Sequence, residues 1–386
     1  MRMNATVAGR LLAAGLDPQD TERVVRGALD EDLRYGPDLT SAATAAPGTR
    51  AVAGVVAREP GVLAGLPVAL AVLDAAGIPP EAAEPLRADG DRIGAGTEVL
   101  RLRAPLRDIL GAERTLLNFL THLSGIATAT RAWVDALSGT GCAVRDTRKT
   151  TPGLRQLEKY AVRCGGGQNH RMGLGDAALI KDNHVAAAGG IAAAIRAVRA
   201  AAPGLPLEVE CDSLAQVGEA LQAGAGLILL DNMGLAELRA AAAMAGRYPS
   251  VRLEASGGLR LEGAGAVAQT GVDFVAVGAL THSSAACSTA AGPPSAAISA
   301  SRWATLGRQC ALSVARQTMS RLIANGQLRS TSLLKGAETG SGRGGSVGFI
   351  CLLLIAGCGP GKLGLRTVSP DRQELRTLIR AVCLIA

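Results

Sequence analysis

Six short aliphatic runs, each closed by a charged or small residue and followed by an Ala/Leu-rich stretch, repeat between residues 142 and 280. Strands that alternate with helices in this way form parallel sheets with right-handed crossovers. Six such units, spaced about 20 to 35 residues apart, predict a closed or nearly closed α/β barrel. The six runs are CAVRDTRK, DAALIKDN, PLEVECDS, LILLDNM, VRLEASGG and VDFVAVGAL.

The carboxyl ends of these runs are where we expect chemistry, because barrel active sites form from the loops at that face. In the third run, side chains should alternate across the sheet. Leu207, Val209 and Cys211 would then face the helices, while Glu208 and Glu210 point into the barrel. A carboxylate in a barrel interior is costly unless it is paired or binds a metal.

The chain before the barrel follows a different pattern. Helical periodicity covers residues 5–30, and the strand-like runs 51–57 and 98–105 alternate with Gly/Pro turns. This pattern predicts an α+β domain packed on the barrel. Residues 113–137 are apolar at helical spacing and are expected to join the two.

Charge is distributed unevenly along the 386 residues, which the overall net charge of +7 does not show. Residues 1–282 have a net charge of −2, whereas residues 283–386 have a net charge of +9 and five of the eight cysteines. We therefore expect three parts: an N-terminal α+β domain over 1–115, a barrel over 116–282, and an atypical basic tail over 283–386.

Two origins of the tail stay open. A shifted reading frame in a GC-rich gene would yield the Ala, Gly, Arg, Ser and Cys that dominate after Ser283, and Arg-containing helical stretches at 302–323 and 371–383 would support an accessory domain. The Gly/Ser-rich span 336–348 is expected to be disordered. Phe349–Ala356 is shorter than the roughly 20 apolar residues that span a bilayer. With no signal-peptide pattern, we expect a cytoplasmic protein with reduced thiols and no membrane partner.

Residues 145–184 are rich in Lys and Arg and carry two histidines around a triple glycine. Such a segment indicates a small, multiply charged anionic substrate. Nucleic acid is disfavoured because the chain has only eight aromatic residues for base stacking, and no nucleotide-binding glycine motif follows a strand. We predict a cationic cup for carboxylates and phosphates, with surface ion pairs as the alternative; its members are Arg148, Lys149, His170, Arg171 and Lys181.

Two carboxylates end successive strands of the predicted barrel. Glu210 and Asp231 should lie side by side at its mouth, where they suit a hard divalent ion such as Mg2+. Pairing of a carboxylate with Lys149 or Lys181 would use the same geometry. Both roles stay open from the residues alone.

Small residues end the last two strands. Ser256, Gly257 and Gly278 lie where barrels often bind phosphate through backbone N–H groups, although tight turns alone would also require glycine. His282 follows the last strand and is either a further phosphate ligand or a surface residue.

Ordered motifs along the first three quarters of the chain carry a family resemblance. They are EDLRYGPDLTS, ERTLLNFLTHLSGIAT, RDTRKTTPGLR, GGGQNHRMGLGDAALIKDNH, EVECDS, LILLDNM, EASGG and VDFVAVGALTHS. In these motifs the chain resembles the quinolinate phosphoribosyltransferase family over residues 20–283. The resemblance implies an α/β fold in which an N-terminal α+β sandwich domain precedes a type II phosphoribosyltransferase-like barrel. The family pattern ends near Ser283, where the atypical tail begins.

The resemblance also implies an activity. Quinolinate and phosphoribosyl pyrophosphate would give nicotinate mononucleotide, pyrophosphate and CO2 in NAD biosynthesis, with Mg2+ as cofactor and a homodimer or larger homo-oligomer as the working form. Quinolinate would be bound by Arg114 of a partner subunit together with Arg148, His170, Arg171 and Lys181. The catalytic residues at the phosphoribosyl centre would be Lys149, Glu210 and Asp231, of which Glu210 and Asp231 would hold the metal. The 5′-phosphate would be bound by Ser256, Gly257, Gly278 and His282.

Two other functions remain as alternatives. A related phosphoribosyltransferase could act on a different acid, although the full set of cations favours a substrate with two carboxylates. A non-catalytic product could instead use its basic tail to bind acidic partners nonspecifically.

Overall fold

The computed structural model describes residues 3–287 and 289–292. The disorder predicted over 336–348 and the helices predicted over 302–323 and 371–383 lie outside the described residues. Within the described part, no helix is both long and apolar enough to cross a membrane. The described cysteines are free thiols, at Cys142, Cys164, Cys211 and Cys287.

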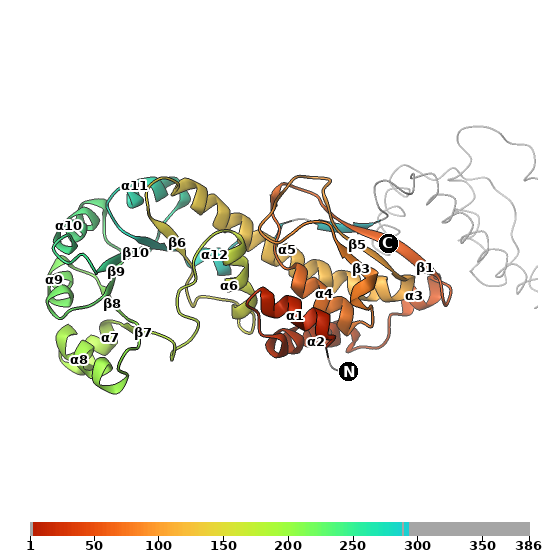
Figure 1. Cartoon of the computed structure of the whole chain (residues 1–386), viewed down its shortest axis with the longest axis horizontal. Coiled ribbons are helices and arrows are strands. Elements are labelled where there is room, and N and C mark those ends of the chain that lie inside the picture. Colours follow the sequence, from red (N-terminus) through yellow and green to blue (C-terminus); the bar gives the residue numbers. More distant parts are fainter. Residues whose placement is uncertain (1–2, 288, 293–386) are drawn as a thin grey trace, which may run out of the picture. The chain divides into compact units, whose positions relative to one another are not determined.

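The N-terminal part combines helices with an antiparallel sheet. The helices are α1 (Ala5–Ala13), α2 (Pro18–Leu33), α3 (Leu39–Thr44), α4 (Leu66–Ala75) and the short 3-10 turn η1 (Pro80–Ala82). The four-stranded sheet has the order β12–β1–β5–β3, with β1 (Arg50–Ala57), β3 (Ala83–Pro85), β5 (Glu98–Pro105) and β12 (Thr289–Gly292). A separate pair joins β2 (Gly61–Val62) to β4 (Arg92–Ile93). Figure 1 shows α1, α2 and α4 on one side of the sheet.

Local chemistry sets where the first helices begin. Asn4, Asp17 and Asp38 each accept a backbone N–H of the following turn at 2.7 to 2.9 Å, which satisfies donors that a helix start leaves free. The helical pattern over residues 5–30 therefore forms two helices. Gly15, at φ +69°, ends the first, and Asp17 caps the second.

One long helix, α5 (Leu106–Ala136), connects the N-terminal part to the barrel. Its buried positions include Leu116, Leu120, Leu123 and Ala127, which recur at the spacing of one helix face. The helix packs on α4 and on α6 (Arg155–Cys164). The helix predicted over residues 113–137 is confirmed, and it begins earlier, at Leu106.

All six predicted runs form strands of one parallel sheet. They are β6 (Ala143–Arg145), β7 (Ala178–Ile180), β8 (Leu207–Cys211), β9 (Leu227–Asp231), β10 (Arg252–Ser256) and β11 (Phe274–Ala276). The order β6–β11–β10–β9–β8–β7 places the first strand beside the last, as a barrel requires. Within the described residues no ladder joins β6 to β7, so the hydrogen bonding of the barrel is open between these two strands.

Helices surround this sheet on its outer side in Figure 1. After α6 they are α7 (Asp182–Ala188), α8 (Ile191–Ala201), α9 (Leu214–Gln222), α10 (Leu235–Ala245), the 3-10 turn η2 (Leu261–Gly263), α11 (Ala264–Ala268) and α12 (Ala279–His282). The predicted α/β class is confirmed. The strands are short and all run in the same direction. Their carboxyl ends therefore lie together at one face of the barrel.

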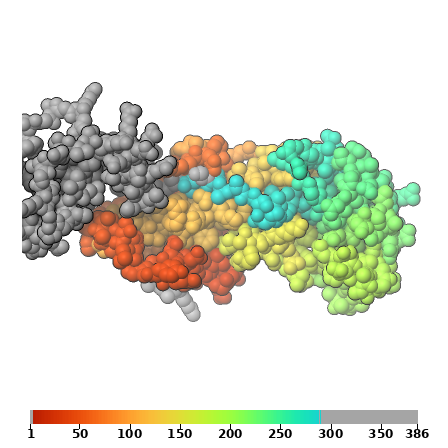
Figure 2. Space-filling view, turned by 180° about the vertical axis from the view of Figure 1, so that it is seen from behind, coloured from red at the N-terminus to blue at the C-terminus, as the bar shows by residue number. Residues whose placement is uncertain are grey.

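The chain returns to the N-terminal sheet after the barrel. Its backbone crosses α5 at Gly125, where an added Cβ would lie 2.1 Å from the carbonyl oxygen of Ala285. The N–H of Cys287 then donates to the carbonyl of Thr121 at 2.9 Å, and β12 pairs with β1. Figure 2 shows the cyan atoms of the last described residues against the yellow and orange atoms of the earlier chain. Strand pairing uses backbone groups, so residues outside the family pattern can still add an edge strand.

Candidate active site

The carboxyl ends of the parallel strands bring the predicted site residues to one face. Lys181 follows β7, Glu210 lies on β8 and Asp231 ends β9. Ser256 ends β10, and Gly278 comes shortly after β11. Parallel strands place these ends at the same edge of the sheet, where barrels form their active sites.

The two predicted metal ligands lie on neighbouring strands. Glu210 pairs with Leu229 in the β8–β9 register, so Asp231, two residues further along, projects from the same face of the sheet. Lys181 Nζ lies 2.7 Å from Glu210 Oε2, and Asn232 Nδ2 donates to Asp231 Oδ2 at 2.8 Å. Glu210 therefore makes the cation pairing that the sequence left open. Both carboxylates remain hard oxygen donors beside each other.

Lys149, Gly278 and His282 come together at the end of β11. A Cβ on Gly278 would lie 3.1 Å from Lys149 Cδ and 3.3 Å from His282 Nε2. Thr281 Oγ1 donates to the carbonyl of Lys149 at 2.8 Å, which holds the loop after β6 against α12. The absence of a side chain at Gly278 lets a lysine and a histidine both lie against its backbone, a grouping that suits an anion.

Gly257 is required by its contact with the loop after β9. It adopts φ +93°, and a Cβ there would lie 2.2 Å from Asn232 Oδ1. Asn232 itself has φ +55° and donates its N–H to the carbonyl of Ser256 at 2.9 Å. Asn232 was not singled out by the sequence, although Asn is among the non-glycine residues that most often take a left-handed conformation.

Two arginines of the predicted cup lie close enough to influence each other. Burial, and then the positive charge of Arg148, lower the pKa of Arg171, while Glu208 and Asp176 oppose this shift. Arg171 Nη1 donates to the carbonyl of Ala177 at 3.1 Å. Neither guanidinium forms a salt bridge within the described residues, and Arg148 Nε is buried there without a hydrogen-bond partner. This arrangement can accept an anion with two acidic groups.

His170 is buried, and both of its ring nitrogens have partners in the protein. Nε2 lies 2.6 Å from Glu208 Oε2, and Nδ1 is 2.8 Å from the backbone N of Arg171, which donates to it. Glu208, the interior acid that the sequence expected to need a partner, thus has one. The ring is adjacent to the cup but faces the barrel interior.

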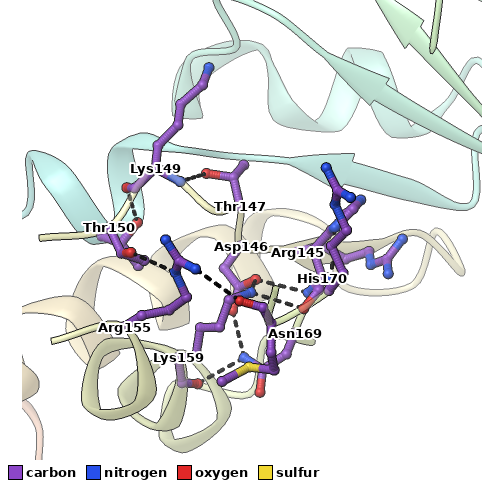
Figure 3. A network of polar contacts seen from close by, with 12 residues as sticks. Arg145, Asp146, Thr147, Lys149, Thr150, Arg155, Lys159, Asn169 and His170 are labelled. Atoms are coloured by element: carbon purple, nitrogen blue, oxygen red, sulfur yellow. Dashed lines mark hydrogen bonds and ion pairs between the residues drawn. The ribbon is translucent and has the colours of Figure 1, made fainter. Parts of the chain in front are cut away.

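A buried ion pair supports the backbone at His170 (Figure 3). Asp146 accepts the N–H of His170 at 2.8 Å and the side-chain amide of Asn169 at 2.5 Å, and it forms an ion pair with Lys159. Lys159 Nζ also donates to the carbonyl of His170 at 2.9 Å. Burial lowers the pKa of Lys159, whereas the neighbouring Asp146 carboxylate opposes that shift. The sequence analysis missed both members of this pair.

Glu254 is a further interior acid that the sequence did not identify. It is fully buried on β10, where Arg145 forms an ion pair with it. Burial, followed by the negative charge of Glu208, raises the pKa of Glu254 to about 7, while Arg145 opposes the shift. The alternation rule that placed Glu208 inside the barrel applies equally to RLEAS, so the signal was available in the sequence.

Arg114 lies apart from this cluster. It is exposed on α5, and within the described residues no hydrogen bond or ion pair joins it to the strand-end residues. The other predicted site residues share the carboxyl face of the barrel.

Comparisons with known proteins agree with this architecture. Residues 38–124 match the family model "Quinolinate phosphoribosyl transferase, N-terminal domain", and residues 126–288 match the model for the C-terminal domain. The chain is 56% identical over 261 residues to the nicotinate-nucleotide pyrophosphorylase [carboxylating] of Mycobacterium leprae, an alignment that covers 67% of this chain and 92% of the relative. It is 39% identical over 279 residues to the human protein of that name, with coverage of 71% and 92%.

Solved structures show the same similarity. The nicotinate-nucleotide pyrophosphorylase of Francisella tularensis superposes with a TM-score of 0.67 at 37% identity, covering 71% of this chain and 95% of that one. NadC from Streptococcus pyogenes gives a TM-score of 0.67 at 40% identity, with coverage of 72% and 97%.

Proposed function

The chain belongs to the quinolinate phosphoribosyltransferase family, and we propose that it converts quinolinate and phosphoribosyl pyrophosphate into nicotinate mononucleotide, pyrophosphate and CO2 in NAD biosynthesis. One observation in the site supports this activity most directly. Arg148 and Arg171 lie near each other without a salt bridge in the described residues, so two guanidinium groups are available for the two carboxylates of quinolinate.

Residues at different strand ends would bind the two substrates. Arg148 and Arg171 would bind the dicarboxylate and orient its ring nitrogen toward the ribose. The backbone at Ser256, Gly257 and Gly278 would bind the 5′-phosphate, with His282 beside it. Lys149 would offset charge on the departing pyrophosphate.

The transferred ribose passes through a state with positive charge at its anomeric carbon as pyrophosphate leaves. The carboxylates of Glu210 and Asp231 would stabilise that charge while the pyridine nitrogen forms the new bond. The ring then carries a positive charge on nitrogen, which stabilises the electron pair left on the adjacent ring carbon when the 2-carboxylate leaves as CO2. A proton from solvent completes the ring carbon. No covalent bond to the protein is needed.

Mg2+ is part of this proposal. Glu210 and Asp231 offer oxygen ligands from one face of two adjacent strands, which fits a hard divalent ion that retains several waters. The ion would supply charge neutralisation for the pyrophosphate group. Lys181 would have to share Glu210 with the metal, because the two side chains are paired at 2.7 Å.

Steady-state turnover tests the activity. Purified full-length chain, quinolinate, phosphoribosyl pyrophosphate and Mg2+ should give nicotinate mononucleotide and CO2. Arg171→Lys should raise the KM for quinolinate by about tenfold or more, because a lysine cannot replace bidentate binding. Arg252→Lys is the matched control, since Arg252 pairs with Asp273 at the start of β10, away from the strand ends. A folded chain that gives no product would favour the non-catalytic alternative.

We further propose that two subunits form each site. Support comes from Arg114, whose exposed position on α5 leaves its guanidinium available to a neighbouring subunit. Arg114→Ala and Lys149→Ala should each lose activity. After the two variants are unfolded and refolded together, about a quarter of wild-type activity should return, because half of randomly paired dimers carry one intact site of two. Absence of recovery in a dimeric mixture would contradict the shared site.

A further inference from the structure

Three charged side chains meet inside the barrel, where apolar residues are the rule. Arg145, Glu208 and Glu254 belong to β6, β8 and β10, which alternate with β11 and β9 in the sheet. Alternate strands of a barrel supply one layer of interior side chains, so these three share a layer. His170 joins them from the segment after α6, which lies beside β6 through the bridge between Gln168 and Arg145.

The hydrogen bonds of His170 define where its ring proton lies. The N–H of Arg171 donates to Nδ1 at 2.8 Å, so Nδ1 must present a lone pair. The ring proton is then on Nε2, which donates to Glu208 Oε2 at 2.6 Å. His170 is therefore a neutral imidazole with both nitrogens occupied, and it adds no positive charge to the cup.

This tautomer also decides what the cluster can bind. His170, Glu208 and Glu254 place three possible metal ligand atoms within 4.8 Å of one another. A metal would need a lone pair on Nε2, but that nitrogen carries the ring proton while Nδ1 accepts from Arg171. Arg145 also neutralises Glu254 directly. The cluster fixes the orientation of the His170 ring and the position of its proton, and it does not suit a metal ion.

We propose that Glu208 and His170 are positioning residues for Arg171. Glu208 accepts the Nε2 proton of His170 and so fixes the tautomer of the ring. Nδ1 of that ring accepts the backbone N–H of Arg171 and so fixes the backbone that carries the Arg171 side chain. Asp146 and Lys159 hold the other side of the same backbone, at the N–H and carbonyl of His170. This inference rests on the proposed function for the identity of the anion that Arg171 meets, and it reassigns His170 from substrate ligand to support.

Nitrogen NMR tests the tautomer on the full-length wild-type chain. The sequence has four histidines, so labelling histidine with 15N gives few ring signals, and the signals missing in His170→Gln identify this residue. At neutral pH, Nδ1 of His170 should be unprotonated and Nε2 protonated. Addition of quinolinate should leave that pattern unchanged. A ring protonated on both nitrogens, with or without quinolinate, would overturn the proposal.

Kinetics test the link to Arg171. Glu208→Ala should raise the KM for quinolinate about tenfold, the scale of one charge-assisted hydrogen bond, and leave the KM for phosphoribosyl pyrophosphate unchanged. Glu208→Gln should restore most of the loss, because its carbonyl can accept the Nε2 proton. In an Arg171→Ala background, Glu208→Ala should add nothing further. Effects that multiply in the two backgrounds would show that Glu208 acts independently.

Two controls keep this test separate from the proposed function. Glu262→Ala removes an exposed carboxylate in η2 and should leave both KM values at their wild-type level. The NMR experiment needs no turnover, so it judges the tautomer even if the chain proves inactive toward quinolinate. It reads the tautomer from the wild-type chain and uses His170→Gln only to assign the signals, so misfolding of Glu208→Ala would not rescue a wrong tautomer.

Discussion

At the residue scale, Glu254 shows how the barrel interior alters a carboxyl group. Its pKa is raised from 4.5 to about 7, first by burial and then by the charge of Glu208. An acid with a raised pKa in the folded state favours folding below pH 4.5, and this contribution is lost as the pH rises to about 7. The free energy of unfolding should therefore fall across this window by at most about 3 kcal/mol from this group.

Glu254→Gln should flatten that pH dependence. Urea unfolding of both proteins at a series of pH values measures the slope, so any constant cost of losing the ion pair with Arg145 does not affect the comparison. Equal slopes in the variant and the wild type would show that Glu254 does not titrate in this window.

Gly257 carries the second prediction at this scale. Alanine there would combine a left-handed φ of +93° with a Cβ 2.2 Å from Asn232 Oδ1. We expect Gly257→Ala to destabilise the fold by about 1 to 3 kcal/mol and to raise the KM for phosphoribosyl pyrophosphate more than that for quinolinate. Gly263→Ala is the matched control, because Gly263 has φ −95° and no atom within 4 Å of an added Cβ. Equal effects of the two variants would contradict this prediction.

Sequence reasoning reached the strand-end residues because alternation and strand direction are local rules. It placed Glu208 inside the barrel and required a partner for it, but it could not choose His170 as that partner. The pair of Asp146 and Lys159 was not predictable in the same way. A lysine on a helix ordinarily faces water, whereas the packing of α6 on α5 and α12 and the ion pair with Asp146 keep this one buried.

At the scale of elements, Tyr160 links α6 to the start of α4. Its hydroxyl donates to Asp89 Oδ2 at 2.5 Å, and the same oxygen accepts the N–H of Gly65 at 2.7 Å. Burial raises the pKa of Asp89, and these hydrogen bonds oppose the shift. The carboxylate thus depends on its donors for its place in the interior.

Tyr160→Phe should destabilise the chain by about 1 to 2 kcal/mol, because a buried carboxylate loses one donor. The midpoint of urea unfolding measures this change. Tyr35→Phe provides the comparison, since Tyr35 is 94% exposed and its hydroxyl can be replaced by water contacts. A Tyr160→Phe midpoint as high as that of Tyr35→Phe would mean that Asp89 needs no donor from α6.

The elements differ in how far the sequence could predict them. The six barrel strands and α5 follow from apolar periodicity over several residues, which reports burial directly. The break between α1 and α2 depends on one glycine conformation at Gly15. The sequence of β12 carries no alternating apolar pattern that would predict a strand. It can still pair with β1, because the free edge of β1 accepts any backbone that can extend beside it.

At the scale of the whole molecule, β12 shows that residues beyond the boundary at Ser283 take part in the fold. The sequence motifs end there, yet the family match continues to residue 288, and the chain crosses α5 and adds β12 to the N-terminal sheet. The origin of the tail over residues 283–386 and the cytoplasmic location stay predictions. The fold can use the first few tail residues whichever origin is correct, because their contacts with β1 are made by the backbone.

Truncation separates these contributions. A chain ending at Gly292 should keep β12 and match the full-length chain in unfolding free energy, kcat and oligomer size. A chain ending at Ser283 should be less stable by about 2 to 4 kcal/mol, since it loses a short ladder of hydrogen bonds and the buried Cys287. It should also associate nonspecifically, because the edge of β1 becomes exposed. Urea unfolding, turnover and size-exclusion chromatography of all three chains measure these differences. If the chain ending at Ser283 equals the one ending at Gly292 in stability and oligomer size, β12 contributes nothing to the fold and the tail is dispensable from its first residue.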